Sequence, residues 1–239
     1  RPPISTLFPY TTLFRSENLD VKKREDSLFA ANVNITLPDL IPLKFQPWVS
    51  IFDACYNASF HQEGYVAGYH IFGEGNTVVT QGNTVNVLQD KWSMELIGML
   101  SEGVRIGFWQ KEVQTLESHL VGDPAFRFTA GSGDKASADA GKLLNKQLAL
   151  SSRDSKIWME YYKSDNPNLK ALALKQLSKN PPPGFSDLLF KTFKESESYI
   201  VRMQALKRMI DLNDRYLVEA LVIRSEERRV GKQCRSRWS

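Results

Sequence analysis

Hydrophobic and polar residues follow one another in short blocks along the first half of the chain. Phe45 to Cys55 contains an apolar run behind a proline, which is typical of a strand that is buried on both faces of a parallel sheet. Tyr65 to Phe72 has small and apolar residues at helical spacing, and Thr77 to Thr80 has the composition of a second buried strand. This order predicts a strand–helix–strand unit.

Two more helices and one more strand are predicted after that unit. Met94 to Leu100 and Val104 to Leu120 both favour helix. The apolar face of the second helix would consist of Trp109, Val113, Leu116 and Leu120. Gly122-Asp123-Pro124 is expected to end that helix as a structural turn, and Ala125 to Phe128 favours a strand. Strands that alternate with helices predict an α/β domain with parallel strands over residues 17–128.

The second half of the chain has a different pattern. Thr129 to Gly141 is small and polar and predicts a linker, whereas residues 142–223 favour helix throughout. Lys170 to Leu177 and Arg202 to Met209 align at a separation of 32 residues, through the segments ALKQL and ALKRM. Such a period favours stacked helical hairpins that resemble HEAT-type repeats, and a simple helical bundle is the alternative.

The two ends of the chain are related in an unusual way. Thr6 to Ser16 reads TLFPYTTLFRS, and Arg224 to Cys234 reads RSEERRVGKQC. The two strands of a common sequencing-library adapter encode almost these two peptides. We therefore expect residues 1–16 and 224–239 to be translated adapter, and residues 17–223 to come from a gene whose true start is missing.

Setting these ends aside changes the charge of the chain. The full sequence has 31 basic and 27 acidic residues and a net charge of +4, which alone would suggest a nucleic-acid or anionic-membrane partner. The ends hold eight of the basic and two of the acidic residues, so residues 17–223 carry a net charge of −2. We therefore expect no nucleic-acid partner. No apolar run reaches the length of a membrane-spanning segment.

Cys55 is the one cysteine that is left when the ends are removed, so an internal disulfide is excluded. It closely follows the first predicted strand, and ligands of parallel sheets bind beyond the carboxyl ends of the strands. By position alone, a buried structural cysteine and a reactive thiol both stay open. The three histidines are too scattered to predict a metal site, and the absence of a glycine-rich phosphate loop predicts no cofactor.

Four motifs add a family resemblance. FDACYNASF, around Cys55, is followed in order by TVVTQGNTVN, QDKW and HLVGDPAFRF. Over residues 37–128 this series resembles the gingipain-type cysteine peptidases, which share the caspase-like fold, and in particular large secreted bacterial relatives with helical repeats. The resemblance implies that Cys55 is the nucleophile of a cysteine endopeptidase acting on peptides or proteins. It also implies that the intact protein is secreted or lies on the cell surface.

Two features depart from the pattern of that family. Ala58 stands where the family has glycine, and alanine fits there without strain only if its φ is negative. The histidine base of the family lies in a His-Gly motif upstream of the cysteine, but residues 17–54 contain no histidine, so this chain alone is predicted to be inactive. His61 is the one candidate for a substitute base and Asn57 would share its cleft; a polar loop residue is the alternative for His61.

The loop after the second strand is the candidate substrate site. In the resembled family this loop supplies an aromatic wall of the substrate pocket, a role that would fall to Trp92, with Asp90 beside it to select a basic side chain. Hydrogen bonds to a peptide are expected from Gln81, Asn83, Thr84 and Asn86. A solvated loop with one half-buried tryptophan is the alternative.

The sequence therefore favours a fragment of a cysteine endopeptidase that is joined to helical repeats. A non-catalytic, peptidase-like scaffold whose repeats bind a protein partner is the alternative, and Ala58 favours it. A serine hydrolase of the α/β type has less support, because no Gly-x-Ser-x-Gly segment occurs.

Overall fold

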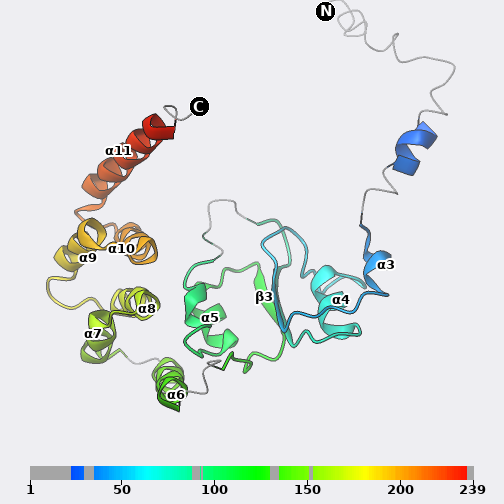
Figure 1. Ribbon diagram of the computed structural model, residues 1–239, viewed down its shortest axis with the longest axis horizontal. Coiled ribbons are helices and arrows are strands. Elements are labelled where there is room, and N and C mark those ends of the chain that lie inside the picture. Colours follow the sequence, from blue (N-terminus) through cyan, green and yellow to red (C-terminus); the bar gives the residue numbers. More distant parts are fainter. Residues whose placement is uncertain are drawn as a thin grey trace, which may run out of the picture.

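The computed structural model of the chain describes residues 23–29, 35–87, 92, 94–129, 135–150 and 153–235 (Figure 1). A small sheet with helices on both sides is followed by a run of helices that leads to the C-terminal end (Figure 1). The chain therefore has a mixed α/β part and a helical part, and the coarse fold prediction is confirmed.

The sheet consists of three strands in the order β1-β2-β3. β1 (Val49–Ile51) and β2 (Val79–Asn83) are parallel, with Val49 opposite Val79, and β3 (Ser118–Gly122) runs antiparallel to β2. The two strands predicted first are both present: β2 is buried at every position as predicted, whereas β1 is only half-buried, although the sequence favoured burial on both faces. The prediction of an all-parallel sheet is wrong, because the third strand runs in the opposite direction.

Helix α4 (Val66–Phe72) connects the two parallel strands, as the helical spacing of its residues predicts. It packs against β2 and β3, and α5 (Ile106–Val113) contacts β3 from the other side of the sheet (Figure 1). A short helix, α3 (Leu37–Leu40), precedes the sheet and packs against α4. The sheet is thus covered by a helix on each side.

The prediction is wrong in detail between η2 (Ile97–Met99) and the end of the α/β part. A short 3-10 helix forms where an α-helix was expected at Met94–Leu100. The helix expected to reach Leu120 ends at Val113, and β3 takes its last residues. Residues 125–128 form no strand.

Ser118 explains why the helix ends early. Its hydroxyl oxygen accepts hydrogen bonds from the backbone N–H of Thr115 at 3.0 Å and from Nε2 of Gln110 at 2.9 Å. These bonds close a turn directly after the helix, and serine competes with helical hydrogen bonding in this way. Leu116 lies in the turn and is 100% exposed, so it is not part of an apolar helix face.

The Gly122-Asp123-Pro124 segment forms the structural turn that its composition predicts. Gly122 has a φ of 109°, in the region that favours glycine, and a Cβ there would lie 2.3 Å from the carbonyl oxygen of Val78. The Asp123 carboxylate accepts a hydrogen bond from the backbone N–H of Ala125 at 2.8 Å. The turn leads out of β3 rather than into a last strand.

The second half of the described chain is helical. Its helices are α6 (Lys135–Ala149), α7 (Ser155–Lys163), α8 (Pro167–Leu177), α9 (Phe185–Glu195), α10 (Tyr199–Asp211) and α11 (Leu217–Arg235). The predicted linker, residues 129–141, is helical from Lys135 onward, and residues 130–134 lie outside the described residues. Helix α11 continues past Ile223, the expected boundary of the adapter-derived end.

Helices α7 and α8 form one hairpin and α9 and α10 form a second, and α8 packs against α10 (Figure 1). The two segments that align in the sequence lie on α8 and α10, so equivalent residues of the alignment occupy neighbouring helices. No helix within the described ranges is long and apolar enough to cross a membrane.

One hydrophobic core extends through both parts of the chain. It includes Val79 on β2 and Trp109 on α5, and it continues through Trp158 on α7 to Leu174 on α8 and Met209 on α10. Trp109 and Trp158 are each 1% exposed. The helical part is therefore packed onto the α/β part rather than tethered beside it.

Candidate functional site

Cys55 lies in the turn that follows β1, at the edge where the parallel strands β1 and β2 both end. Its side chain is exposed, and its sulfur accepts a hydrogen bond from the backbone N–H of Val87 at 3.3 Å. This is the edge at which parallel sheets bind ligands. The structure thus gives Cys55 the location and the exposure that a reactive thiol needs, and its catalytic role stays a prediction.

The turn around Cys55 has an unusual backbone. Tyr56 has a φ of 58°, in the left-handed region, and its N–H donates to the carbonyl of Val85 at 3.3 Å. Ala58 is fully buried and is not among the residues of positive φ. The φ of Ala58 is therefore negative, as alanine requires to fit there without strain. The strained backbone of this turn is that of Tyr56.

Asn83 and Asn57 fix the backbone on each side of Cys55. Nδ2 of the fully buried Asn83 donates to the carbonyl of Phe52 at 3.2 Å and to that of Ala54 at 3.3 Å. Oδ1 of Asn57 accepts the backbone N–H of Asn83 at 2.8 Å, and its Nδ2 donates to the carbonyl of Ala54 at 2.7 Å. Asn83 therefore holds the turn from within, a role different from the substrate contact that the sequence suggested.

Gly82 permits this arrangement. A Cβ at this position would lie 2.4 Å from Oδ1 of Asn57 and 2.8 Å from Cβ of Ala58. Such distances are far below van der Waals contact, so the turn that carries Cys55 packs directly on the backbone of β2. The Gly-Asn pair of β2 was interpreted in the sequence as the start of a loop, and its part in the support of Cys55 was missed.

The other predicted substrate residues differ in their access to solvent. Gln81 is 7% exposed. Thr84 is half-buried, and its carbonyl accepts the Ser59 hydroxyl at 2.9 Å. Trp92 is half-buried, whereas Asp90 lies outside the described residues. Asn86 is exposed, so Asn86 and the half-buried Trp92 and Thr84 are the members of the predicted set that reach the surface.

None of the three histidines contacts the sulfur of Cys55 in the described part of the chain. His61 is exposed in the outgoing loop. His70 stacks on Phe45 with ring centroids 3.6 Å apart, its Nδ1 lies 3.2 Å from Oγ of Ser50, and burial lowers its pKa, so the neutral form is favoured. His119 lies on β3 and meets Phe60 edge to face. The geometry supplies no base for Cys55 from this set.

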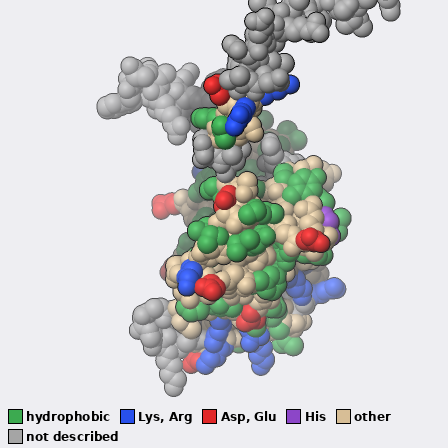
Figure 2. Space-filling view, turned by 90° about the vertical axis from the view of Figure 1, so that its right-hand side faces the viewer, with side chains coloured by type: hydrophobic (Ala, Val, Ile, Leu, Met, Phe, Trp, Pro, Cys, Tyr) green, Lys and Arg blue, Asp and Glu red, His purple; other side chains and the backbone are tan. Residues whose placement is uncertain are grey.

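A cavity of about 330 Å³ lies beside α4, lined by Tyr65, Tyr69 and Phe72 among others. Figure 2 views the side of the molecule on which α3 and α4 lie, where hydrophobic side chains gather at the surface. Phe72 and Ile41, which both line the cavity, are 76% and 62% exposed. Cys55, His61 and Trp92 are not among the lining residues, so this cavity is separate from the predicted site.

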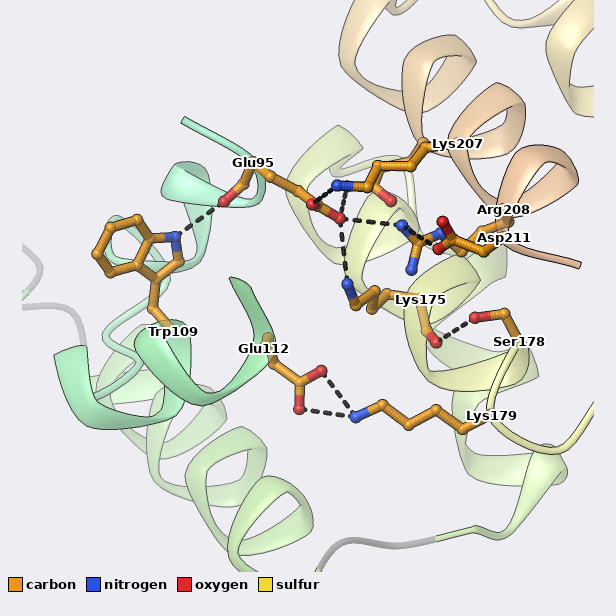
Figure 3. Close-up of polar contacts among 10 residues, drawn as sticks. Glu95, Trp109, Glu112, Lys175, Ser178, Lys179, Lys207, Arg208 and Asp211 are labelled. Carbon is orange, nitrogen blue, oxygen red and sulfur yellow. Dashed lines mark hydrogen bonds and ion pairs between the residues drawn. The ribbon is translucent and has the colours of Figure 1, made fainter. Parts of the chain in front are cut away.

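A polar cluster around one buried carboxylate was not anticipated from the sequence. The carboxylate of Glu95, a residue 2% exposed, accepts hydrogen bonds from Lys175, Gln204, Lys207 and Arg208 (Figure 3). We call these five residues the Glu95 cluster. Glu95 belongs to the α/β part, and its four partners lie on α8 and α10. The cluster therefore joins the two parts of the chain through one carboxylate.

The repeat in the sequence holds the signal that would have revealed this cluster. Lys175 and Lys207 occupy equivalent positions of the aligned segments ALKQL and ALKRM. Nζ of Lys175 lies 3.3 Å from Oε1 of Glu95, and Nζ of Lys207 binds Oε2 of the same carboxylate. Two copies of one motif thus place two ammonium groups on one anion.

The charges of the cluster shift one another's pKa values. Burial by itself raises the pKa of the Glu95 carboxyl, but the hydrogen bond from Lys207, the charge of Lys175 and the hydrogen bond from Gln204 outweigh it and lower that pKa. Burial and the nearby charge of Arg208 lower the pKa of Lys175, and Glu95 offsets only part of this effect. The cluster therefore favours the ionised form of Glu95 and disfavours the charged form of Lys175.

A second ion pair crosses the same junction. Nζ of Lys179, which follows α8, lies 2.8 Å and 2.7 Å from the two carboxylate oxygens of Glu112 on α5 (Figure 3). The side chain of Glu112 is 5% exposed and that of Lys179 is 46% exposed. This pair is close to the Glu95 cluster in the fold but lies on a different element of the α/β part.

Comparisons with protein-family models, with curated proteins and with solved structures find no match to the chain. Within the described ranges, no group of three His, Cys, Asp or Glu side chains lies close enough together to bind a metal ion.

Proposed function

We propose that Cys55 is the nucleophile of a cysteine endopeptidase that resembles the gingipain-type family. In this proposal residues 17–128 are part of a caspase-like catalytic domain, and the helices that follow are HEAT-like repeats. The observation that carries the proposal is the exposed sulfur at the carboxyl edge of β1, 3.3 Å from a backbone N–H donor. A secreted or cell-surface bacterial protein is part of the same proposal.

The chemistry requires an ionised sulfur. In this proposal the base removes the proton of the Cys55 thiol, and the sulfur lies 3.3 Å from the backbone N–H of Val87. The thiolate attacks the scissile carbonyl carbon, and backbone N–H groups hold the oxyanion that forms. The amine leaves with a proton from the protonated base, and water then hydrolyses the thioester to release the acid and regenerate Cys55.

The base of this reaction is proposed to be a histidine encoded upstream of the chain. His61 is exposed and has no hydrogen bond to Cys55, which supports a base outside the described residues. The 239-residue chain is therefore expected to hydrolyse no peptide. Incubation with a mixture of peptides and mass spectrometry measures this, and turnover that a Cys55→Ala variant loses would contradict the assignment of the base.

The reactivity of Cys55 itself is tested by alkylation of the native chain. Cys234 is changed to serine first, so that Cys55 is the one remaining thiol. We expect iodoacetamide to modify Cys55 fully in the folded protein at the rate of an accessible thiol. A thiol that reacts only after unfolding would overturn the proposal.

The alternative is a non-catalytic scaffold with the shape of a peptidase domain. It is favoured by the absence, within the described residues, of a hydrogen bond between a histidine and Cys55, and by Ala58, whose methyl group is fully buried where the resembled family has glycine. The upstream part of the gene decides between the two. A His-Gly pair after a buried strand supports the peptidase, and the absence of such a pair supports a scaffold that binds a protein partner.

A further inference from the structure

A pocket lined by basic side chains lies where α5 and α6 pack against each other (Figure 1). Its volume is about 290 Å³. Three segments contribute its four basic residues: Arg105 directly before α5, Arg127 after the Gly122-Asp123-Pro124 turn, and Lys142 and Lys146 on α6. None of the described residues that line this pocket is acidic. We call these four residues the basic pocket.

The charge of the basic pocket is not explained by the charge of the chain. Residues 17–223 carry more acidic than basic residues. Among the described residues, one carboxylate pairs with the four cations: Asp139 lies 3.0 Å from Nζ of Lys142, and both side chains are more than half exposed. Arg105, Arg127 and Lys146 have no ion pair there. An exposed pair neutralises little charge, so at least three positive charges remain to attract an anion.

Asn145 holds two sides of the pocket in place. It is 8% exposed, and its Oδ1 accepts the backbone N–H of Arg105 at 2.9 Å. Its Nδ2 donates to the carbonyl of Gly103 at 2.8 Å and to that of Gly141 at 2.7 Å. A Cβ at Gly141 would lie 2.9 Å from the carbonyl oxygen of Glu102, so α6 packs directly on this backbone. The positions of Arg105 and of the α6 lysines are thereby fixed relative to each other.

The third side of the pocket is held by two backbone bonds. The N–H of Gly107 donates to the carbonyl of Pro124, and the N–H of Ile106 donates to that of Phe126, each at 2.9 Å. Both bonds join the start of α5 to the segment that ends in Arg127. The backbone that carries the four cations is therefore built before any ligand binds, which lowers the entropy that binding costs.

We propose that the basic pocket binds a compact oligophosphate, either free or as part of a nucleotide. A phosphate group carries up to two negative charges on three acceptor oxygens. The guanidinium groups of Arg105 and Arg127 have the fork of N–H donors that matches phosphate oxygens, and the two lysines add point charges. This site is independent of Cys55 and of the peptidase assignment.

The size of the pocket favours a small ligand. Its volume lies near the lower end of the range of small-molecule sites, roughly 300 to 1,000 Å³. Lys142 and Lys146 are one helical turn apart, so their like charges face the same side of α6 and repel each other. An anion with several charges on few atoms relieves this repulsion, whereas the carboxylates of a peptide are spread along its chain.

A nearby carboxylate does not occupy Arg127. Glu102 lines a neighbouring cavity of about 180 Å³ that Arg127 also lines. Its Oε1 accepts hydrogen bonds from Oγ of Ser101 at 3.3 Å and from Nδ2 of Asn168 at 3.1 Å. Within the described residues it forms no ion pair with Arg127, so the guanidinium group stays available to an anion.

Titration of the full chain with tripolyphosphate in a calorimeter tests the proposal. We expect one-to-one binding that weakens as the salt concentration rises, and a melting temperature that increases with ligand. Arg127→Gln and Lys146→Gln should each raise the Kd at least about fivefold, as expected for the loss of one charge near the ligand. Arg127→Lys keeps the charge and should recover part of the lost affinity.

Two controls remove charge elsewhere. Lys194 is exposed on α9 and lines none of the described cavities, so Lys194→Gln should change the Kd less than about twofold. The double variant Arg228→Gln/Arg229→Gln tests the basic C-terminal end and should have as small an effect. If either control raises the Kd as much as Arg127→Gln, or if tripolyphosphate does not bind, the proposal is overturned. If Arg127→Gln does not fold, Lys146→Gln decides, because Lys146 is exposed on α6.

Other probes identify the source of the phosphate. Equal affinities for ATP and tripolyphosphate support a free oligophosphate. Tighter binding of ATP that Phe108→Leu abolishes supports a nucleotide, because the half-buried Phe108 also lines the pocket. Binding of hexaglutamate that is tighter than that of tripolyphosphate would overturn the proposal in favour of an acidic peptide.

Discussion

The turn around Cys55 and the helical hairpins are held in place by different kinds of interaction. The turn depends on hydrogen bonds from Asn57 and Asn83, and the side chain of its cysteine, Cys55, is exposed. The hairpins depend on apolar burial, with Leu172, Leu174 and Leu177 of α8 each at most 1% exposed. Functional loops typically have an exposed side chain, a few specific hydrogen bonds that hold the backbone around it, and a rigid scaffold beside them.

Most of the buried core and the support of Cys55 are therefore supplied by different parts of one chain. The hairpins bury the larger share of the core, and they also send the four partners of Glu95 into the α/β part. The α/β part contributes the sulfur and the strand edge.

The largest effect is expected from Leu174→Ala in α8. Leu174 is completely buried in the core, so truncation should lower the free energy of unfolding by about 3 kcal/mol through lost burial and the cavity left behind. Urea denaturation measures it. Leu116→Ala is the control, because Leu116 is 100% exposed, and we expect it to cost less than about 0.5 kcal/mol. A large loss of unfolding free energy in Leu116→Ala would indicate that Leu116 is buried, as in the longer helix that the sequence predicted.

Gly82→Ala tests the polar region. The added Cβ would meet Oδ1 of Asn57 at 2.4 Å, so the turn must move away from β2 at a cost of about 2 kcal/mol from overpacking. We expect the alkylation rate of Cys55 to change with it, because Asn57 holds the backbone directly next to the cysteine. Gly184→Ala is the control for a glycine substitution, since nothing lies within 4 Å of a Cβ there, although its φ of 77° adds strain. An unchanged Cys55 rate in Gly82→Ala would mean that the turn does not depend on this packing.

The elements that the sequence predicts correctly are those whose signals are local. The two parallel strands and α4 follow from short apolar blocks, and the aligned segments of α8 and α10 are both helical, as expected. In β2, α8 and α10 the residues that define the element are also largely buried. Period and composition are then sufficient.

The features that the sequence did not predict depend on partners far along the chain. β3 pairs with β2 in the antiparallel direction, with Gly122 opposite Val79, whereas apolar spacing alone favoured a longer helix there. The support of Cys55 by Asn83, and the Glu95 cluster, join residues separated by tens to more than a hundred positions. Of these, only the paired lysines had a signal in the sequence, through the alignment of α8 with α10.

Acid should weaken the junction through Glu95. The pKa of Glu95 is lowered from its ordinary value of 4.5, so its stabilising contribution is fully present above that value and is lost as the pH falls through the lower pKa of the folded state. The difference in unfolding free energy between the wild type and Glu95→Gln should therefore shrink below about pH 4.5, by at most about 1.4 kcal/mol per pH unit. Urea titrations of both proteins at several pH values measure this.

Asp39 provides the control for acid, because its pKa is also lowered, by hydrogen bonds from Thr36, but it lies at an exposed helix start far from the junction in the sequence. In Asp39→Asn the acid dependence that comes from Glu95 should persist. A difference between the wild type and Glu95→Gln that stays constant with pH would show that Glu95 gains nothing from its cationic partners.

The smallest effect separates two helix starts that lie four residues before the two aligned segments, at the same separation of 32 residues. Asn166 begins α8, and its side chain accepts hydrogen bonds from the N–H groups of Asn168 and Leu169, whereas Ser198 begins α10 without such a bond. Asn166→Ala should therefore lower the free energy of unfolding by about 1 kcal/mol, and Ser198→Ala by less than about 0.5 kcal/mol. Chemical denaturation of the two variants measures the difference. Equal losses would mean that Ser198 caps α10 in solution as Asn166 caps α8, and that the two hairpins are more alike in their capping than their hydrogen bonds indicate.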